Sequence, residues 1–299
     1  MKEQTTWAAY LLLILLPHSV FALGPMSEEP KFPPARGFSL SIRYAPAART
    51  IPARAVLSAL PLSTPAAPDK FTLRSVSRDF LKDAGEIWSY PVHIRKRDIL
   101  PIAGFGAMTG FLIANDEALA RWFGDYRDSH AWVRAVSPVI TEMGATGAWG
   151  TVAAFLVVGL IAKDDKAVGT AALASSAMLQ SGLLVTFLKG MTGRQRPFWA
   201  NGVDHWSGPV GFFKRFGKGH YGRYDSFPGG HTATAFALAT VVAMQYHKGV
   251  LVPILAYTTA TGVGLSRMTE KKHWLSSVFV GGILGHLIGR MVVLNHRRR

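Results

Sequence analysis

The hydrophobic positions of this chain gather into six apolar segments, all of them after residue 98. Several segments are shorter than the roughly 20 residues that a helix needs to cross a hydrocarbon core. They are rich in Gly, Ala and Thr, which let neighbouring helices approach closely. We therefore predict an all-α fold, a bundle of about six apolar helices that are expected to be transmembrane. A water-soluble bundle with unusually apolar helices is the alternative. The segments are residues 99–115, 149–162, 167–188, 232–246, 250–265 and 278–294.

The stretch 75–90 has a different pattern, because its apolar residues fall on a single helical face. Pro91 follows and ends the pattern. An amphipathic helix of this kind can lie on a membrane surface. Its apolar face consists of Val76, Phe80, Leu81, Ala84, Ile87 and Trp88.

The first 72 residues have a different character from the rest of the chain. Lys2 precedes a short apolar run at 7–16, and the small-residue sequence Val20-Phe21-Ala22 follows. This pattern predicts a signal peptide at 1–22, with an uncleaved N-terminal anchor as the alternative. Residues 23–72 are rich in Pro and Ala and predict a flexible linker. The helical domain is then expected to occupy residues 73–299.

Charge is sparse but strongly positive. Charged residues make up 17% of the 299, against about 25% in soluble domains, and the net charge is +15. The basic residues stand at the ends of apolar segments, at 93–98, 163–166, 247–248 and 296–299, whereas a nucleic-acid-binding protein concentrates them on one arm or helix. We therefore expect a membrane partner and no nucleic acid. The absence of cysteine excludes disulfides and cysteine nucleophiles.

The same basic residues predict a topology. With a cytoplasmic C-terminal tail, six crossings bring all the short basic loops to the cytoplasmic side, as the positive-inside rule requires. A cleaved signal peptide conflicts with this arrangement at one point, because it leaves residues 93–98 outside. Three resolutions stay open: the first segment does not cross, the N-terminal run is not cleaved, or the bundle only rests against the membrane.

Three short runs carry the candidate chemistry, and each adjoins the end of an apolar segment. The first, at 189–197, contains Lys189, Arg196 and Pro197. Arginine can grip two phosphate oxygens in a fork, and lysine acts as a compact positive charge. Alone, this spacing is more typical of a basic anchor at a membrane surface.

The second and third runs add two histidines. The sequence Pro228-Gly229-Gly230-His231 opens an apolar segment, where a glycine backbone and helix N–H groups can approach an anion. Arg267 and His273 form the third run. Histidine is the usual residue for proton or phosphoryl transfer near neutral pH. Individually, these runs also fit a loop before a helix and an interfacial histidine, so the argument depends on the three together.

Together the runs resemble the signature K-x6-R-P, P-S-G-H and S-R-x5-H-x3-D of the type-2 phosphatidic acid phosphatase and vanadium haloperoxidase superfamily. The resemblance covers about residues 150–290. It implies that His273 attacks phosphorus and forms a phosphohistidine, and that His231 protonates the leaving group and then helps to activate water. Lys189, Arg196 and Arg267, with the backbone at Gly230, would hold the phosphate by electrostatic preorganisation, without a metal or other cofactor.

Two positions depart from that signature. Gly229 stands where the family has serine, so a hydroxyl donor is missing; its backbone N–H remains, and Ser226 is a candidate substitute. Ser277 stands where the family has the aspartate that orients the nucleophilic imidazole. Its hydroxyl can accept the same hydrogen bond without supplying charge, and Asp225 and Glu270 are candidate replacements for the carboxylate. Replacing Ser277 by aspartate is therefore expected to raise turnover.

The leading hypothesis is a slow, acid phosphatase-like phosphoric monoester hydrolase of the membrane. Its substrate would be a lipid phosphate, such as phosphatidic acid or an isoprenoid pyrophosphate, on the extracytoplasmic face of a bacterial-type inner membrane. A soluble or peripheral periplasmic location is the alternative. The alternative functions are phosphoryl transfer to an alcohol, vanadate-dependent haloperoxidation, and phospholipid binding without turnover.

Overall fold

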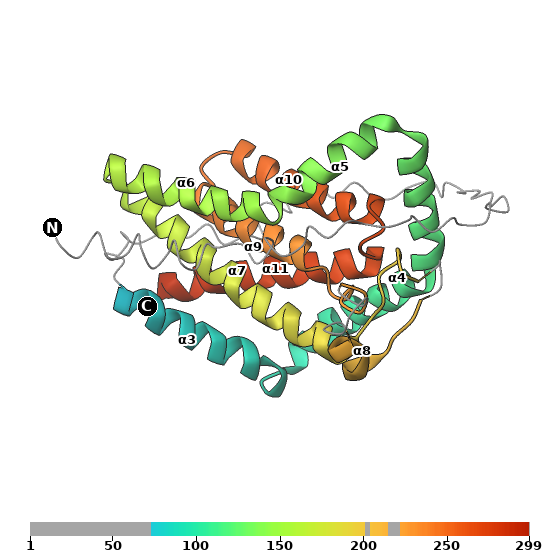
Figure 1. Ribbon diagram of the computed structural model, residues 1–299. Coiled ribbons are helices and arrows are strands. Elements are labelled where there is room, and N and C mark those ends of the chain that lie inside the picture. The colour runs from blue at the N-terminus through green and yellow to red at the C-terminus, as the bar shows by residue number, and fades with distance from the viewer. Residues whose placement is uncertain (1–72, 201–203, 215–221, 299) are drawn as a thin grey trace, which may run out of the picture.

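The computed structural model describes residues 73–200, 204–214 and 222–298. The predicted signal peptide and linker at 1–72 lie outside these ranges. The described residues form helices joined by short loops, and the predicted all-α fold is confirmed (Figure 1). The helices are α3 (Leu73–Ser89), the 3₁₀ turn η2 (Tyr90–Val92), α4 (Lys96–Ser129), α5 (Ala131–Met143), α6 (Thr146–Ala162), α7 (Asp165–Thr192), α8 (Gly208–Lys214), α9 (Gly230–Gln245), α10 (Leu251–Thr269) and α11 (Leu275–Arg298).

Helix α9 forms the centre of the bundle and packs against α7, α10 and α11. Glycines at every fourth position of α11 make its contact with α9 very close: a Cβ atom at Gly281 or Gly285 would overlap the carbonyl of Gly229 or Ala233. Gly289 faces the carbonyl of Ala237 in the same way. Small residues therefore hold these two helices together by backbone contact, as in membrane bundles.

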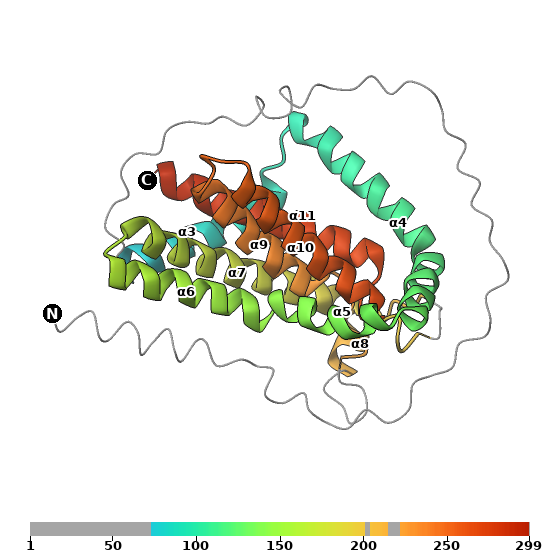
Figure 2. The ribbon, with the colours of Figure 1, turned by 90° about the horizontal axis from the view of Figure 1, so that it is seen from above.

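Three helices, α4, α7 and α11, are long and apolar enough to cross a membrane. A fourth span is added if α5 and α6, which meet at a bend of 47°, count as one. All six predicted segments lie in helices, of which α9 and α10 do not pass this test of length and hydropathy. Helix α4 diverges from the bundle toward its N-terminus (Figure 2), where Leu100 is 81% exposed.

The predicted amphipathic helix is α3. Its Ile87 is buried in the core, while Leu81 is exposed. Asp83, also buried, accepts a hydrogen bond of 3.0 Å from Asn295 Nδ2 near the end of α11. A polar contact therefore docks α3 against the C-terminal part of the bundle.

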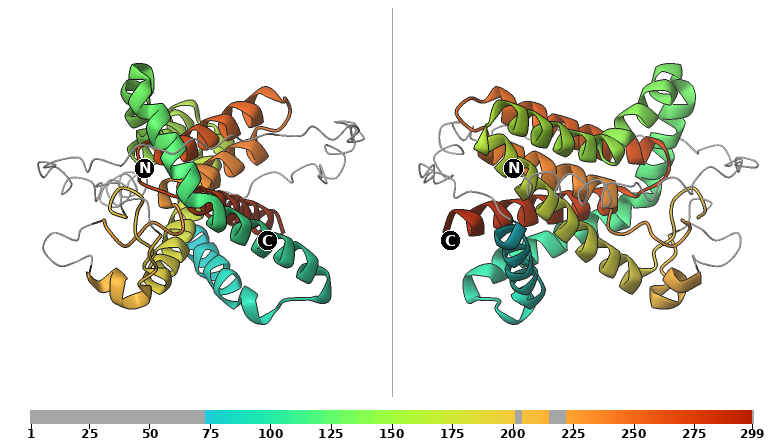
Figure 3. Two further views of the ribbon diagram at one scale, coloured as in Figure 1. Left: turned by 90° about the vertical axis from the view of Figure 1, so that its right-hand side faces the viewer. Right: turned by 60° about the vertical axis from the view of Figure 1, so that its left-hand side comes forward.

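The three sequence runs meet at one end of the bundle. This end carries the C-termini of α7 and α10 and the N-termini of α9 and α11, on the right in Figure 1; Figure 3 (left) is viewed from this side. Because these four helices alternate in direction, their other termini lie at the opposite end. The bundle thus gathers residues far apart in sequence onto one rim.

Candidate active site

The first run leaves α7 through a tight turn. Lys189 lies in the last turn of α7, and Gly193 ends the helix with φ of +51°. A side chain is strained in this left-handed conformation, which glycine adopts freely. Beyond the turn, Arg196 Nε donates a 2.7 Å hydrogen bond to Asp225 Oδ1, and Lys189 Nζ lies 4.0 Å from Asp225 Oδ2. Asp225 thereby ties both cations of the first run to the loop that carries the second.

The second run begins α9, with Gly229 at the N-cap. Lys189 Nζ lies 3.4 Å from the position that a Cβ atom would take at Gly230. This is an ordinary van der Waals distance, so the ammonium group lies close to the first turn of α9. The first N–H groups of a helix have no partner within it and carry partial positive charge, so this turn is suited to an anion.

The third run is a compact turn between α10 and α11. The carbonyl of Arg267 accepts hydrogen bonds from the backbone N–H groups of Lys272, at 3.0 Å, and His273, at 3.2 Å. The Arg267 guanidinium donates from Nη1 to Glu270 Oε2 at 2.9 Å, and Glu270 Oε1 accepts from Thr141 of α5 at 3.0 Å. These bonds fold His273 back beside Arg267.

His273 is oriented by the second run. Its Nδ1 lies 2.6 Å from the backbone oxygen of Ser226, and the ring is buried, with only 2% of the residue exposed. A carbonyl can only accept, so Nδ1 carries the proton and Nε2 carries the lone pair. The geometry gives His273 the tautomer that a nucleophile needs.

The electrostatics of both imidazoles are dominated by burial and then by the three cations. Burial, followed by Arg196, Arg267 and Lys189, holds the pKa of His273 well below its ordinary value. The pKa of His231 is lowered in the same way by burial and then by the same cations, with Arg267 the strongest. Both rings are therefore neutral near pH 7 in the free protein.

Asp225 balances part of this positive charge. Burial opposes its ionisation, but Arg196 and then Lys189 outweigh burial and hold the pKa of Asp225 well below its usual range. It is a permanent carboxylate between the cations and does not bond to His273, whose Nδ1 is taken by the Ser226 carbonyl. Glu270 is likewise engaged, with Arg267.

Several buried polar atoms around the second and third runs make no hydrogen bond within the described part of the chain. They are Ser226 Oγ, Thr232 Oγ1 and Arg267 Nε. Buried donors of this kind are rare unless something else satisfies them. Ser226 and Arg267 also contribute to the turns that hold His273, so unsatisfied donors occur beside the two neutral imidazoles.

Two expectations about the departing positions need correction. The N–H of Gly229 donates to the Ser277 carbonyl at 2.8 Å, so it is committed to the α9–α11 contact. The Ser277 hydroxyl lies 3.5 Å from Arg194 Nη1 and makes no bond to His273. Ser226 does support the site, but through its carbonyl, because its hydroxyl has no described partner.

The family resemblance was tested against known proteins. Residues 170–299 match the model of the PAP2 superfamily. This match confirms the resemblance that the three runs indicate, and the matched segment contains all of them.

Three individual proteins are similar to parts of this chain. The lipid A 1-phosphatase of Porphyromonas gingivalis is 40% identical over 68 residues, which are 22% of this chain and only 15% of the length of that relative. Aquifex aeolicus LpxE is structurally similar with a TM-score of 0.45 and 21% identity over 60% of this chain and 94% of that one. A transmembrane PAP2-type phosphatidylglycerolphosphate phosphatase from Bacillus subtilis gives a TM-score of 0.43 and 22% identity over 73% and 92% of the two chains.

Two residues outside the PAP2 motif positions were missed by the sequence analysis. Arg194 lies inside the first run, and its side chain is fully buried. Asp116, on α4 and before the PAP2 match begins, is fully buried too and forms an ion pair of 2.7 Å with it. A lone aspartate following a long apolar segment was the available signal, since a buried charge requires a partner.

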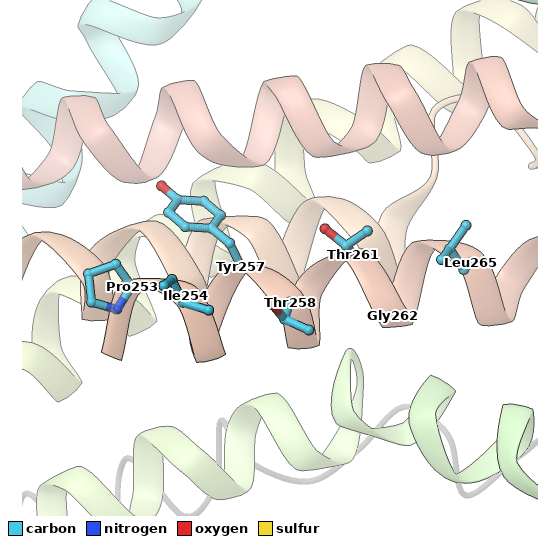
Figure 4. A pocket seen from close by; sticks show the side chains of 7 residues that line it. All are labelled: Pro253, Ile254, Tyr257, Thr258, Thr261, Gly262 and Leu265. Atoms are coloured by element: carbon cyan, nitrogen blue, oxygen red, sulfur yellow. The ribbon is translucent and has the colours of Figure 1, made fainter. Parts of the chain in front are cut away.

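An apolar groove on α10 is separate from the PAP2 motifs. All its lining residues come from that one helix (Figure 4), and none of them belongs to the three runs. The groove is lined by Pro253, Ile254, Tyr257, Thr258, Thr261, Gly262 and Leu265.

Within the described ranges, no three His, Asp or Glu side chains are grouped to hold a metal ion.

Proposed function

We propose that this protein is a lipid phosphatase that works through a phosphohistidine. The observation that carries the proposal is the meeting of the Nδ1-protonated His273, the neutral His231 and three cations around the first turn of α9. Such a site has charge to hold a phosphate and a lone pair to attack it. The PAP2 match supports the assignment to lipid phosphate hydrolysis.

The phosphate would bind at the first turn of α9. Lys189, Arg196 and Arg267 supply positive charge, and the Arg267 Nε donor, without a described partner, gains an acceptor when phosphate is bound. Ser226 Oγ is a further buried group that a phosphate oxygen would satisfy. Ser226 thereby replaces the hydroxyl that Gly229 lacks.

In the first step, the Nε2 lone pair of His273 forms a bond to phosphorus while the bond from phosphorus to the leaving oxygen breaks. His231 gives its proton to that oxygen, so the lipid leaves as an alcohol, or as a lipid phosphate if the substrate is a pyrophosphate. The bound dianion offsets the surrounding cations, which raises the pKa of His231 and lets it enter the step protonated.

In the second step, water attacks the phosphohistidine. His231, now neutral, removes a proton from the water, the P–N bond breaks and inorganic phosphate forms. Nε2 of His273 recovers its lone pair, and His231 regains its proton. The Ser226 carbonyl accepts from Nδ1–H throughout and stabilises the positive charge that the ring carries while phosphorylated.

The substrate is proposed to be a lipid phosphate monoester or pyrophosphate at the extracytoplasmic leaflet. The phosphorylated saccharolipid that the Porphyromonas gingivalis relative is named for belongs beside phosphatidic acid and isoprenoid pyrophosphate in the test panel. The extracytoplasmic side follows from the predicted topology, in which the short basic segments at 163–166, 247–248 and 296–299 are cytoplasmic.

The test measures phosphate release by detergent-solubilised protein from that panel, with EDTA present. His273→Ala is expected to lower the rate by more than about 10³-fold, as loss of a nucleophile does. His286→Ala is the matched control. That histidine is also in the bundle but bonds to Tyr257 and Thr240, and its loss should leave the rate within about threefold.

Radioactive substrate should also leave an acid-labile, alkali-stable label on the wild-type protein and none on His273→Ala. A folded wild-type protein that releases no phosphate from any lipid would contradict the hydrolase and favour binding without turnover. Label retained by His273→Ala would contradict the assignment of the nucleophile alone.

A further inference from the structure

A buried ionic cluster lies beside the candidate site. Arg194 Nη2 donates to Asp116 Oδ2 at 2.7 Å, and Nε and Nη2 grip the two carboxylate oxygens of Asp204 at 2.8 and 2.7 Å. The guanidinium carbon lies 4.5 Å from the ring centre of Trp206 and 5.0 Å from that of Trp274. An arginine that is fully buried, binds a carboxylate through two nitrogens and stacks on aromatic rings is held in one position.

This cluster is bonded to α11 immediately after His273. Arg194 Nη1 donates to Ser276 Oγ at 2.6 Å, and Asp116 Oδ1 accepts from the backbone N–H of Ser276 at 3.0 Å. The Ser276 hydroxyl also makes a short hydrogen bond to Asp116 Oδ2. Asp116 therefore joins α4, the first run and the start of α11 in one buried contact.

The backbone of Arg194 continues the connection to the nucleophile. Its carbonyl accepts from the N–H of Ser226 at 3.0 Å, and the Ser226 carbonyl in turn accepts from His273 Nδ1 at 2.6 Å. Fixing Arg194 thus fixes the carbonyl that orients His273. Two hydrogen bonds separate the cluster from the imidazole.

We propose that Asp116 is a positioning residue for His273, serving in place of the carboxylate that PAP2 proteins carry at the position of Ser277. It acts through Arg194 and Ser226 and does not touch substrate. This inference rests on the proposed function.

The position of Ser277 explains why its side chain does not orient His273. Its side chain is fully buried, and its hydroxyl lies 3.5 Å from Arg194 Nη1, whereas His273 Nδ1 is bonded to the Ser226 carbonyl. An aspartate there would be a third carboxylate around one guanidinium, next to Asp116 and Asp204. Ser277→Asp alone is therefore expected to leave turnover unchanged or lower it, contrary to the expectation from the sequence motif.

The test exchanges the two residues. Asp116→Ser should lower kcat by roughly 10- to 100-fold, because misplacement of a catalytic group by about 1 Å costs about that much. KM should stay within about threefold, since Lys189 and Arg267 are held by α7 and α10. Adding Ser277→Asp to Asp116→Ser returns a carboxylate to Arg194 and should recover at least a tenth of wild-type kcat.

Asp83→Ser is the matched control, because Asp83 is another buried carboxylate, bonded to Asn295 far from the rim. It should lower the unfolding temperature without changing kcat. If Asp116→Ser does not fold in detergent, Asp116→Asn keeps the size of the side chain and answers the same question.

Three results would overturn the inference. The first is a folded Asp116 variant that keeps the wild-type kcat, and the second is an Asp116 variant whose kcat and KM change in parallel. The third is an equal loss of kcat in Asp83→Ser. Each is read against wild type and His273→Ala. An active wild type with an inactive His273→Ala shows that the proposed function holds even when the inference on Asp116 fails.

Discussion

The two site histidines share an environment that determines the pH range of activity. Burial, and then the positive charges of Arg196, Arg267 and Lys189, lower the pKa of His273, and the same influences lower that of His231. A lowered pKa keeps the nucleophile neutral to lower pH, and it also means that the general acid gains its proton only at lower pH. The pH profile of kcat/KM reports the pKa values of the free enzyme. Both its rising and its falling limb should therefore shift to lower pH.

We expect the kcat/KM optimum below about pH 6.5, the ordinary imidazole value. The kcat optimum should lie higher, because bound phosphate offsets the cations and raises both pKa values. Lys189→Met provides the control: it removes one cation without altering the ionisation of the substrate, so the optimum should rise although the rate falls. An optimum above pH 6.5 that the substitution does not move would contradict this account.

At the same scale, the sequence motifs predict which residues gather at the rim but not how the imidazole is held. Lys189, Arg196 and Arg267 lie near enough to His231 and His273 to lower the pKa of both imidazoles. The acceptor for His273 is a backbone carbonyl, and every residue type has one, so no side-chain pattern could indicate it.

Among the helices, the contact between α9 and α11 positions the second run against the third. It depends on glycine at positions where α11 meets the α9 backbone, and at Gly285 a Cβ atom would overlap the Ala233 carbonyl. Gly285→Ala should therefore force the helices apart and lower the free energy of unfolding by about 1–3 kcal/mol. Thermal unfolding in detergent measures the change.

The matched control is Gly182→Ala in α7, where nothing lies within 4 Å of the added Cβ atom. Alanine there relieves the conformational entropy that a mid-helix glycine loses, so a gain of up to about 1 kcal/mol is expected. If both variants unfold at the same temperature, the close α9–α11 contact does not contribute to stability.

The hydrophobic periodicity of the sequence does not predict every helix or helix boundary. Helix α5 was not predicted, because its pattern is short and includes Pro138, yet its polar face bonds to α10 through Ser137 and Thr269 at 2.8 Å. Helix α4 continues to Ser129, past the end of its apolar segment at residue 115. Asp116 lies one residue beyond that end and contacts Ser276, 160 positions away, a pairing that only the tertiary fold creates.

Over the whole molecule, the candidate site lies at one end of the bundle, and three short basic segments lie at the other end. Helices α7, α9, α10 and α11 each carry a site residue at the rim and have their other terminus away from it. The distant termini are flanked by Lys163 and Lys166, by His247 and Lys248, and by the C-terminal arginines. From these segments we propose, by the positive-inside rule, that this end is cytoplasmic and that the rim faces outward.

The absence of native cysteine makes this orientation directly measurable. Ser129→Cys adds an exposed thiol beside Asp128, which pairs with Lys271 at the rim, and Lys248→Cys adds one at the opposite end. In spheroplasts, a membrane-impermeant maleimide should label Ser129→Cys at once and Lys248→Cys only after the membrane is permeabilised. The reverse pattern would turn the site toward the cytoplasm and require a substrate in the inner leaflet. Equal labelling of both before permeabilisation would mean that the bundle rests on the outer surface of the membrane without crossing it.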